Sequence, residues 1–290
     1  MSRLSRWLRS HRPDPKPYVP PPDSYEHLLY APRFQARSIE LAGGEFHITD
    51  GVTFYASHCE IFRDEIYRFP ASRPTPLIVD CGANCGVSVA YFKMLYPRAR
   101  IIAVEADPKI FEILNRNVVQ RGYADVTLLN KAVAVGDKPV TFHHEGADAG
   151  RIHKMQNAKG ECTVPVIGLD ELLQEPVDFL KIDIEGAETD VICSCTRLEA
   201  AAQVFLEYHS FADAAQSLHR VLEKLASSGF RYYLRTQFCP KRPLVEESCH
   251  LGMDLQVNVF AKRIGLRSVR HLQNPVCGNG QSSPDVGRAA

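Results

Sequence analysis

The feature that most constrains the fold is a repeated alternation between short, mostly apolar runs and segments long enough to form helices. We expect strands at 77–80, 101–104, 126–129, 179–182, 204–206, 231–238 and 255–261, and helices at 87–96, 108–121, from about 186, and at 212–227. Strands that alternate with helices predict a mostly parallel sheet covered on both faces. The last two runs have no helix between them, which indicates an antiparallel pair at the sheet edge. The predicted fold class is therefore α/β, with a doubly wound, Rossmann-like, seven-stranded sheet.

The chain before this alternation predicts an N-terminal β-hairpin extension. Residues 38–55 alternate apolar and polar side chains around Gly43-Gly44 and Asp50-Gly51, which is typical of short antiparallel strands joined by tight turns. Residues 60–69 are expected to form a short helix that Pro70 closes. The expected organisation is a basic segment with a proline-rich linker at 1–37, a globular domain at 38–264 and a disordered tail at 265–290.

Composition excludes some classes of partner. Lys+Arg and Asp+Glu both total 34, so the formal net charge is zero and nucleic acid is not an expected partner. The nine cysteines show no zinc-binding spacing and predict reduced, buried thiols in the cytoplasm. Residues 1–12 carry arginines at intervals of three beside apolar side chains. This segment is expected to be either a solvated terminus or a peripheral membrane contact. The oligomeric state is left open.

A glycine-rich turn follows the first strand of the predicted sheet. It runs from Asp80 through Gly82, Ala83 and Asn84 to Gly86. Its pattern differs from the G-x-G-x-x-G of dinucleotide-binding proteins, which disfavours a nicotinamide-dependent oxidoreductase, and from the P-loop. The helix N-terminus behind it offers free N–H groups to a carboxylate. An acid at the strand end would repel a pyrophosphate but suits the ammonium and sulfonium groups of S-adenosylmethionine.

Further polar residues follow the neighbouring strands, where ligands of doubly wound sheets bind. Glu105 ends the second strand, and its carboxylate can accept hydrogen bonds from both ribose hydroxyls of an adenosine. Asn130 ends the third strand. Together with the glycine turn, these residues predict a site for an adenosine-containing cofactor.

At these residues the sequence resembles the FkbM-type methyltransferases. The resemblance covers roughly residues 52–262 and rests on IVDCGANCGVSVAYF, AVEADPKIFEILNRNV, VTLLNKAV, LDELL…DFLKIDIEGAE and FLEYH. It implies a class I methyltransferase fold, S-adenosylmethionine as cofactor, and O-methylation of a small-molecule or glycan hydroxyl, as in a sugar, a glycolipid or a natural product. By the same resemblance, Asp80, Gly82, Asn84 and Gly86 would bracket the methionine part, Glu105 would bind the ribose, and Asn130 and Lys131 would lie near the adenine. Ala83 and Ala106 are also expected to bind the cofactor. Glu60 and Tyr67 would close over the cofactor.

The remaining strand ends carry the candidate catalytic residues Asp183, Glu185, Glu207 and His209. His209 is the first candidate for the base that deprotonates an alcohol, because imidazole titrates near neutrality. Glu207 would orient it or bind the acceptor, and Asp183 and Glu185 are expected to point together into the site. A divalent-metal site for Mg²⁺ or Mn²⁺ built from the same four residues is the less favoured alternative, and polar capping without chemistry is the third.

Two further functions stay open at this point. Transfer to nitrogen would need less help from a base, since an amine carries a free lone pair. A non-catalytic module that binds S-adenosylmethionine would retain the glycine turn. Glu188 is interpreted as a first-turn residue favoured by the helix dipole. Residues 136–160 and 239–253 are the expected loops that select the acceptor.

Overall fold

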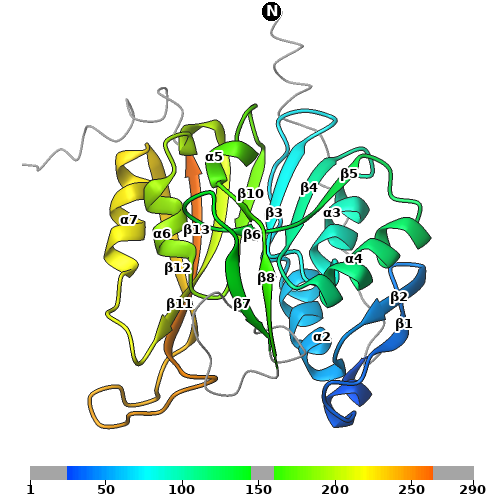
Figure 1. Cartoon of the computed structure of the whole chain (residues 1–290), viewed down its shortest axis with the longest axis horizontal. Helices are drawn as coiled ribbons and strands as arrows, with labels where there is room; N and C mark the ends of the chain where they lie inside the picture. Colours follow the sequence, from blue (N-terminus) through cyan, green and yellow to red (C-terminus); the bar gives the residue numbers. More distant parts are fainter. Residues whose placement is uncertain (1–24, 145–159, 264–290) are drawn as a thin grey trace, which may run out of the picture.

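The computed structural model describes residues 25–144 and 160–263, whose centre is a seven-stranded sheet (Figure 1). In spatial order the strands are β12 (Phe230–Phe238), β13 (Met253–Arg263), β11 (Gln203–Phe211), β10 (Phe179–Ile182), β3 (Leu77–Cys81), β4 (Arg100–Glu105) and β5 (Val126–Asn130). The pairs from β11 to β5 are parallel, whereas β13 is antiparallel to both β11 and β12. The predicted class I methyltransferase fold, with its antiparallel edge, is confirmed.

Helices cover both faces of this sheet. On one face are α3 (Val87–Leu95) and α4 (Pro108–Gln120), and on the other are α5 (Leu169–Leu172), α6 (Glu188–Ser194) and α7 (Leu218–Ser227). Alternate residues of a strand enter the two cores, because side chains in a strand point to opposite faces. In β3, Ile78 belongs to the first core, and Leu77 and Val79 belong to the second. The expected helix at 212–227 starts only at Leu218, after a turn in which Tyr208 accepts the N–H of Ser217.

The N-terminal extension contains the predicted hairpin, formed by β1 (Arg37–Leu41) and β2 (Gly44–Ile48). The next expectation was wrong. Asp50-Gly51 is not a hairpin turn, and the helix expected at 60–69 lies earlier, as α2 (Gly51–His58) and a π-helical turn, η2 (Cys59–Arg63). The cause is the Asp50 carboxylate, which caps α2 by accepting the N–H of Thr53 and also accepts hydrogen bonds from Arg33 and Phe34.

Short elements complete the described part of the chain. They are η1 (Glu26–Tyr30), η3 (Leu198–Ala200), the parallel pair β6 (Ala132–Val133) with β9 (Val166–Ile167), and the antiparallel pair β7 (Val140–His144) with β8 (Gly160–Val164). Helix η1 lies inside the segment expected to be a linker, yet its Leu28 is buried.

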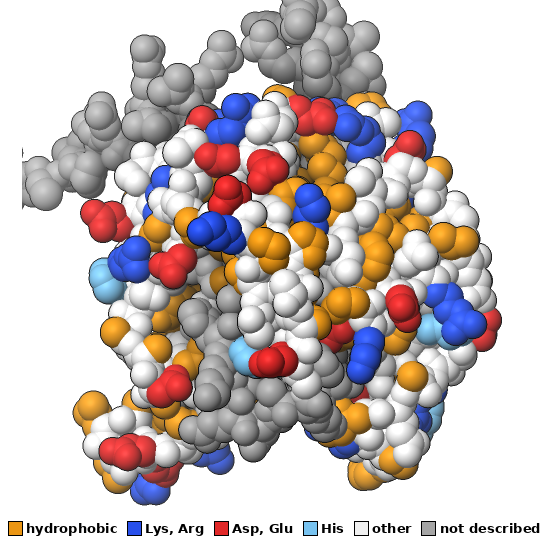
Figure 2. Space-filling view, in the orientation of Figure 1, with side chains coloured by type: hydrophobic (Ala, Val, Ile, Leu, Met, Phe, Trp, Pro, Cys, Tyr) orange, Lys and Arg blue, Asp and Glu red, His pale blue; other side chains and the backbone are white. Residues whose placement is uncertain are grey.

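The basic segment at 1–12, the tail at 265–290 and much of the expected loop at 136–160 lie outside the described residues. Within the described part, no helix is long and apolar enough to cross a membrane. Acidic and basic side chains are interspersed over the face shown in Figure 2, which agrees with the balanced net charge.

Candidate active site

A cavity of about 360 Å³ opens at the carboxyl ends of β3, β4, β10 and β11. The chain reverses its direction of travel across the sheet between β3 and β10, because β4 and β5 extend one side and β10 and β11 extend the other. Such a switch point is where doubly wound folds bind ligands, and the volume lies in the range of small-molecule sites. Helix α2 and the turn η2 add Thr53, Ser57 and Glu60 to the wall.

The glycine-rich turn forms the floor of one end of this cavity. Gly82 has a φ of +81°, and a Cβ atom there would lie 1.7 Å from the backbone oxygen of Asp183. Only glycine therefore allows the turn after β3 to pass directly against the chain after β10. Helix α3 begins behind the turn without a side-chain cap, and its first residues Val87 and Ser88 line the cavity. Its first N–H groups are thus available to a carboxylate.

Glu105 lies at the end of β4 and also lines the cavity. One carboxylate oxygen accepts the N–H of Asn84 at 2.9 Å, and the other accepts the N–H of Asp107 at 2.8 Å. Burial raises the pKa of Glu105 to about 7, and the two backbone hydrogen bonds act against this rise. Each oxygen retains a lone pair for a further donor, as two ribose hydroxyls would require.

Asp80 is fully buried behind the turn and does not line the cavity. Its carboxylate accepts the hydroxyl of Ser88 at 2.6 Å and lies 3.4 Å from the ammonium of Lys181. The parallel register between β3 and β10 pairs these two residues, which explains their proximity. Asp80 is therefore positioned to fix the turn and Lys181.

Two other residues of the predicted cofactor site lie outside the cavity wall. Gly86 packs against Leu114, since a Cβ atom there would lie 2.8 Å from its side chain. Asn130 donates to the backbone oxygens of Glu105 and Ala106, and so holds the chain after β4. The remaining predicted residues all line the cavity. They are Glu60, Gly82, Ala83, Asn84, Glu105, Ala106, Lys131, Asp183, Glu185, Glu207 and His209.

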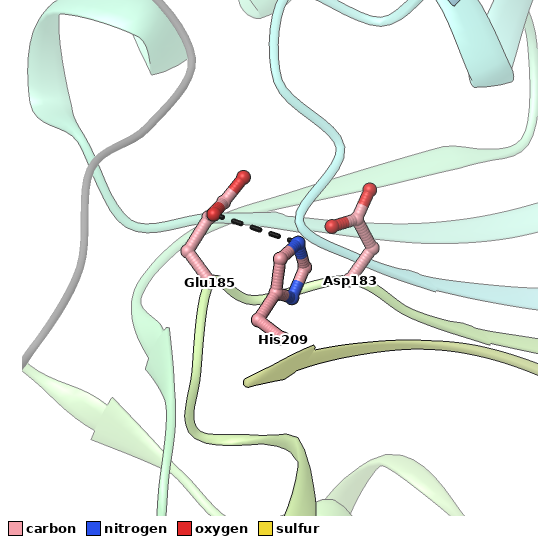
Figure 3. A group of neighbouring side chains, drawn as sticks. All are labelled: Asp183, Glu185 and His209. Carbon is pink, nitrogen blue, oxygen red and sulfur yellow. Dashed lines mark ion pairs between the residues drawn. The ribbon is translucent and has the colours of Figure 1, made fainter. Parts of the chain in front are cut away.

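The opposite end of the cavity is rich in carboxylates (Figure 3). Asp183 and Glu185 follow β10, and His209 comes from the neighbouring strand β11. One ligand-type atom of each of the three lies within 4.8 Å of the others. The two acids face the same region as expected, but the cause is the left-handed turn at Glu185 and Gly186 rather than strand alternation.

His209 is held by carboxylates on both sides of its ring. Its Nδ1 lies 3.0 Å from Glu188 and its Nε2 lies 3.6 Å from Glu185. Burial acts to lower the pKa of His209, but the charges of Glu185 and Glu188 outweigh it and raise that pKa well above its usual value. The two carboxylates therefore favour the protonated imidazole in this arrangement, whereas the sequence suggested a neutral base.

Two further carboxyl groups complete this end of the cavity. Glu207 is 8% exposed and accepts a hydrogen bond from Gln256, whose side chain also lies 3.4 Å from Nε2 of His209. Burial, together with the charge of Asp183, raises the pKa of Glu207 well above its usual value. Glu60 accepts a hydrogen bond from Gln237, and burial with the charge of Asp183 raises its pKa to about 7.

Sequence reasoning missed two residues of this region. Lys181 donates to the backbone oxygen of Gly82 at 2.7 Å and lies 3.3 Å from Asp183, so it joins the two ends of the cavity. Its signal was a charged residue inside an apolar strand. Burial acts to lower the pKa of Lys181, but Asp183 and Asp80 raise it. Glu188 is no simple first-turn residue, because it is 1% exposed and accepts from the N–H groups of Ile184 and Gly186.

Comparisons with known proteins identify the family of this chain. The methyltransferase FkbM domain family matches residues 80–232. "Methyltransferase 1" of Beauveria bassiana (strain ARSEF 2860) is 30% identical over 185 residues, which cover 51% of this chain and 74% of that protein. "2-O-methyltransferase NoeI" of Sinorhizobium fredii (strain NBRC 101917 / NGR234) is 27% identical over 142 residues, which cover 41% of this chain and 57% of that protein. The solved structure of methyltransferase FkbM from Methylobacillus flagellatus KT aligns with a TM-score of 0.43 and 17% identity, over 68% of this chain and 46% of that one.

Proposed function

Since this chain belongs to the FkbM family and is an S-adenosylmethionine-dependent methyltransferase, we propose that it methylates a hydroxyl oxygen of a small, polyhydroxylated acceptor. A sugar, a glycolipid or a hydroxylated natural product fits this description. The relative named 2-O-methyltransferase NoeI supports transfer to oxygen, because its name specifies methylation of an oxygen atom.

The observation that carries the proposal is the division of one cavity into two chemically different ends. One end combines an uncapped helix N-terminus with Glu105, and these features suit the carboxylate and ribose of S-adenosylmethionine. The other end gathers Asp183, Glu185, Glu207 and His209, which offer hydrogen-bond acceptors to hydroxyl groups. Lys181 contacts Gly82 after β3 and Asp183 after β10, so the two ends adjoin at these neighbouring strands.

We assign the cofactor end to residues that face it. Glu105 accepts the ribose hydroxyls, the N–H groups at the start of α3 bind the methionine carboxylate, and Ala83, Asn84, Ala106 and Lys131 line the wall. Asp80, Gly86 and Asn130 act indirectly, by holding this wall in place. When bound, S-adenosylmethionine supplies a methyl group already activated by its sulfonium.

The acceptor end has to align the hydroxyl and remove its proton. An O–CH₃ bond forms as the S–CH₃ bond breaks, and the hydroxyl proton passes to a carboxylate of the chain. Glu207 is our candidate for that carboxylate, because it faces the cavity. Its Oε1 accepts a hydrogen bond from Gln256, which holds the carboxyl group in place beside the acceptor. Asp183 and Glu185 orient the acceptor, and cationic His209 offsets their charge.

The test uses the full chain with S-adenosylmethionine carrying a ¹³C-methyl group and a panel of sugars and natural-product alcohols. Each alcohol is paired with the analogue in which an amine replaces the hydroxyl. We expect an O-methyl product by NMR. Glu207→Gln should lower kcat by about 10²–10⁴-fold and leave cofactor affinity unchanged. Methylation of the amines alone would contradict transfer to oxygen.

A further inference from the structure

The acceptor end brings several carboxyl groups close together. Glu60, Asp183, Glu185, Glu188 and Glu207 meet there. Lys181 lies 3.3 Å from Asp183, and His209 lies 3.6 Å from Glu185. Carboxylates and an imidazole that converge on one point form the kind of ligand set that binds a divalent cation.

Three residues of this end have the geometry of a metal site. Asp183, Glu185 and His209 each place one ligand-type atom within 4.8 Å of the others (Figure 3). Nε2 of His209 lies 3.6 Å from Oε2 of Glu185. This distance falls between the ~3 Å of adjacent ligands and the ~4 Å of opposite ligands around an octahedral ion with bonds of ~2.1 Å.

A second observation comes from the far side of the imidazole. Nδ1 of His209 lies 3.0 Å from Glu188, whose side chain is 1% exposed and is itself fixed by the N–H groups of Ile184 and Gly186. A carboxylate behind the other ring nitrogen is the arrangement that orients metal-binding histidines, because it directs Nε2 at the ion. The side chain of His209 is 1% exposed, so Nε2 reaches only the cavity.

A third observation is Glu207, which is 8% exposed and lines the same cavity beside His209. Its Oε1 accepts from Gln256, and no donor to its Oε2 is recorded among the described residues. This oxygen is available to the proton of a hydroxyl or water molecule bound to an ion.

We propose that Asp183, Glu185 and His209 bind one divalent cation, which in turn binds a hydroxyl oxygen of the acceptor. Two carboxylates with one imidazole suit Mn²⁺ or Mg²⁺, since both prefer oxygen ligands and Mn²⁺ also accepts nitrogen. His209 would bind the ion through Nε2 as the neutral imidazole whose Nδ1 faces Glu188, with the Nε2 proton released to water, and Glu207 would take the hydroxyl proton. The role of the ion in methyl transfer rests on the proposed function, whereas its binding does not.

The experiment measures Mn²⁺ alone, by electron paramagnetic resonance and by calorimetry, on metal-stripped full-length protein. We expect one bound ion per chain. Asp183→Asn and Glu185→Gln should each weaken binding at least tenfold, and Glu188→Gln should weaken it by about 10–100-fold through the orientation of His209. The control is Asp190→Asn, which removes an equal charge from an exposed side chain of α6 and should leave Mn²⁺ affinity unchanged within twofold.

Absence of Mn²⁺ binding to the folded wild-type protein at millimolar concentration would overturn the proposal, as would equal losses in Asp190→Asn and Asp183→Asn. The test separates the two proposals. If the protein binds no Mn²⁺ and the metal-stripped protein still methylates hydroxyl groups, the metal site is refuted and the proposed function stands. If the protein binds Mn²⁺ but methylates no hydroxyl group, the proposed function is refuted and the metal site stands.

Discussion

Replacement of Gly82 by alanine should damage the cofactor site far more than its size suggests. At a φ of +81° any residue with a Cβ atom is strained, by about 1–2 kcal/mol. The new methyl group would also lie 1.7 Å from the backbone oxygen of Asp183, and backbone cannot rotate away as a side chain can. Forced separation of packed segments costs about 1–3 kcal/mol more. Gly82→Ala should therefore lower the free energy of unfolding by about 2–5 kcal/mol.

Gly229 provides a matched control, because its φ is +82° and a Cβ atom there meets nothing within 4 Å. Gly229→Ala should lose only the strain of about 1–2 kcal/mol. Thermal unfolding measures both, with each kcal/mol worth roughly 2–4 °C in a chain of this size. Calorimetry should find S-adenosylmethionine affinity lowered at least tenfold in Gly82→Ala and unchanged in Gly229→Ala. Equal losses of stability with equal cofactor affinity would refute the steric argument.

Three further predictions concern charge. Calorimetry should show that cofactor affinity falls as the pH drops through about 7, the pKa of Glu105, because the protonated carboxyl loses an acceptor site. The Glu105→Gln variant should bind the cofactor weakly at every pH. His58 is buried among aromatic rings, and burial lowers its pKa from 6.5 to about 4. Between pH 6.5 and pH 4 the unfolded chain therefore binds a proton at His58 that the folded chain does not bind. The free energy of unfolding consequently has its full value above pH 6.5 and falls by up to about 3 kcal/mol toward pH 4. His58→Phe should flatten that acid limb of Tm, and an unchanged limb would exclude His58 as its source. Lys181→Met should cost about 3–5 kcal/mol, seen in urea unfolding, because Asp80 and Asp183 lose their buried counter-ion; a loss below 1 kcal/mol would contradict the pairing.

The sheet was predictable because its signals are local. Each strand is a short apolar run, and helix α4 begins at the Asp107 cap and ends before Gly122, as expected. The start of α2 was missed because Asp50 followed by glycine also suits a turn. The choice depends on Arg33 and Phe34, which reach the same carboxylate from a different part of the chain.

The sequence predicted which residues line the cavity better than it predicted what each of them does. Strand ends identify which side chains lie near the switch point, and most of the predicted ones line the cavity. Whether Asp80 faces ligand or Lys181 depends on the register of β3 with β10, which a single sequence does not reveal. The charge of His209 likewise depends on Glu188, whose folding back into the core has no local signal.

The switch between β3 and β10 has a consequence for how this scaffold can diversify. Strands β3 and β4 carry the residues assigned to the cofactor, whereas β10, β11 and β13 carry those assigned to the acceptor. The two sets meet through Lys181 and the Gly82 turn. Substitutions at Met253 or Gln256 of β13 should therefore alter the choice of acceptor while the methyl donor stays the same. Directed evolution toward new acceptors should concentrate its libraries on β13 and keep Glu207, His209 and that junction intact.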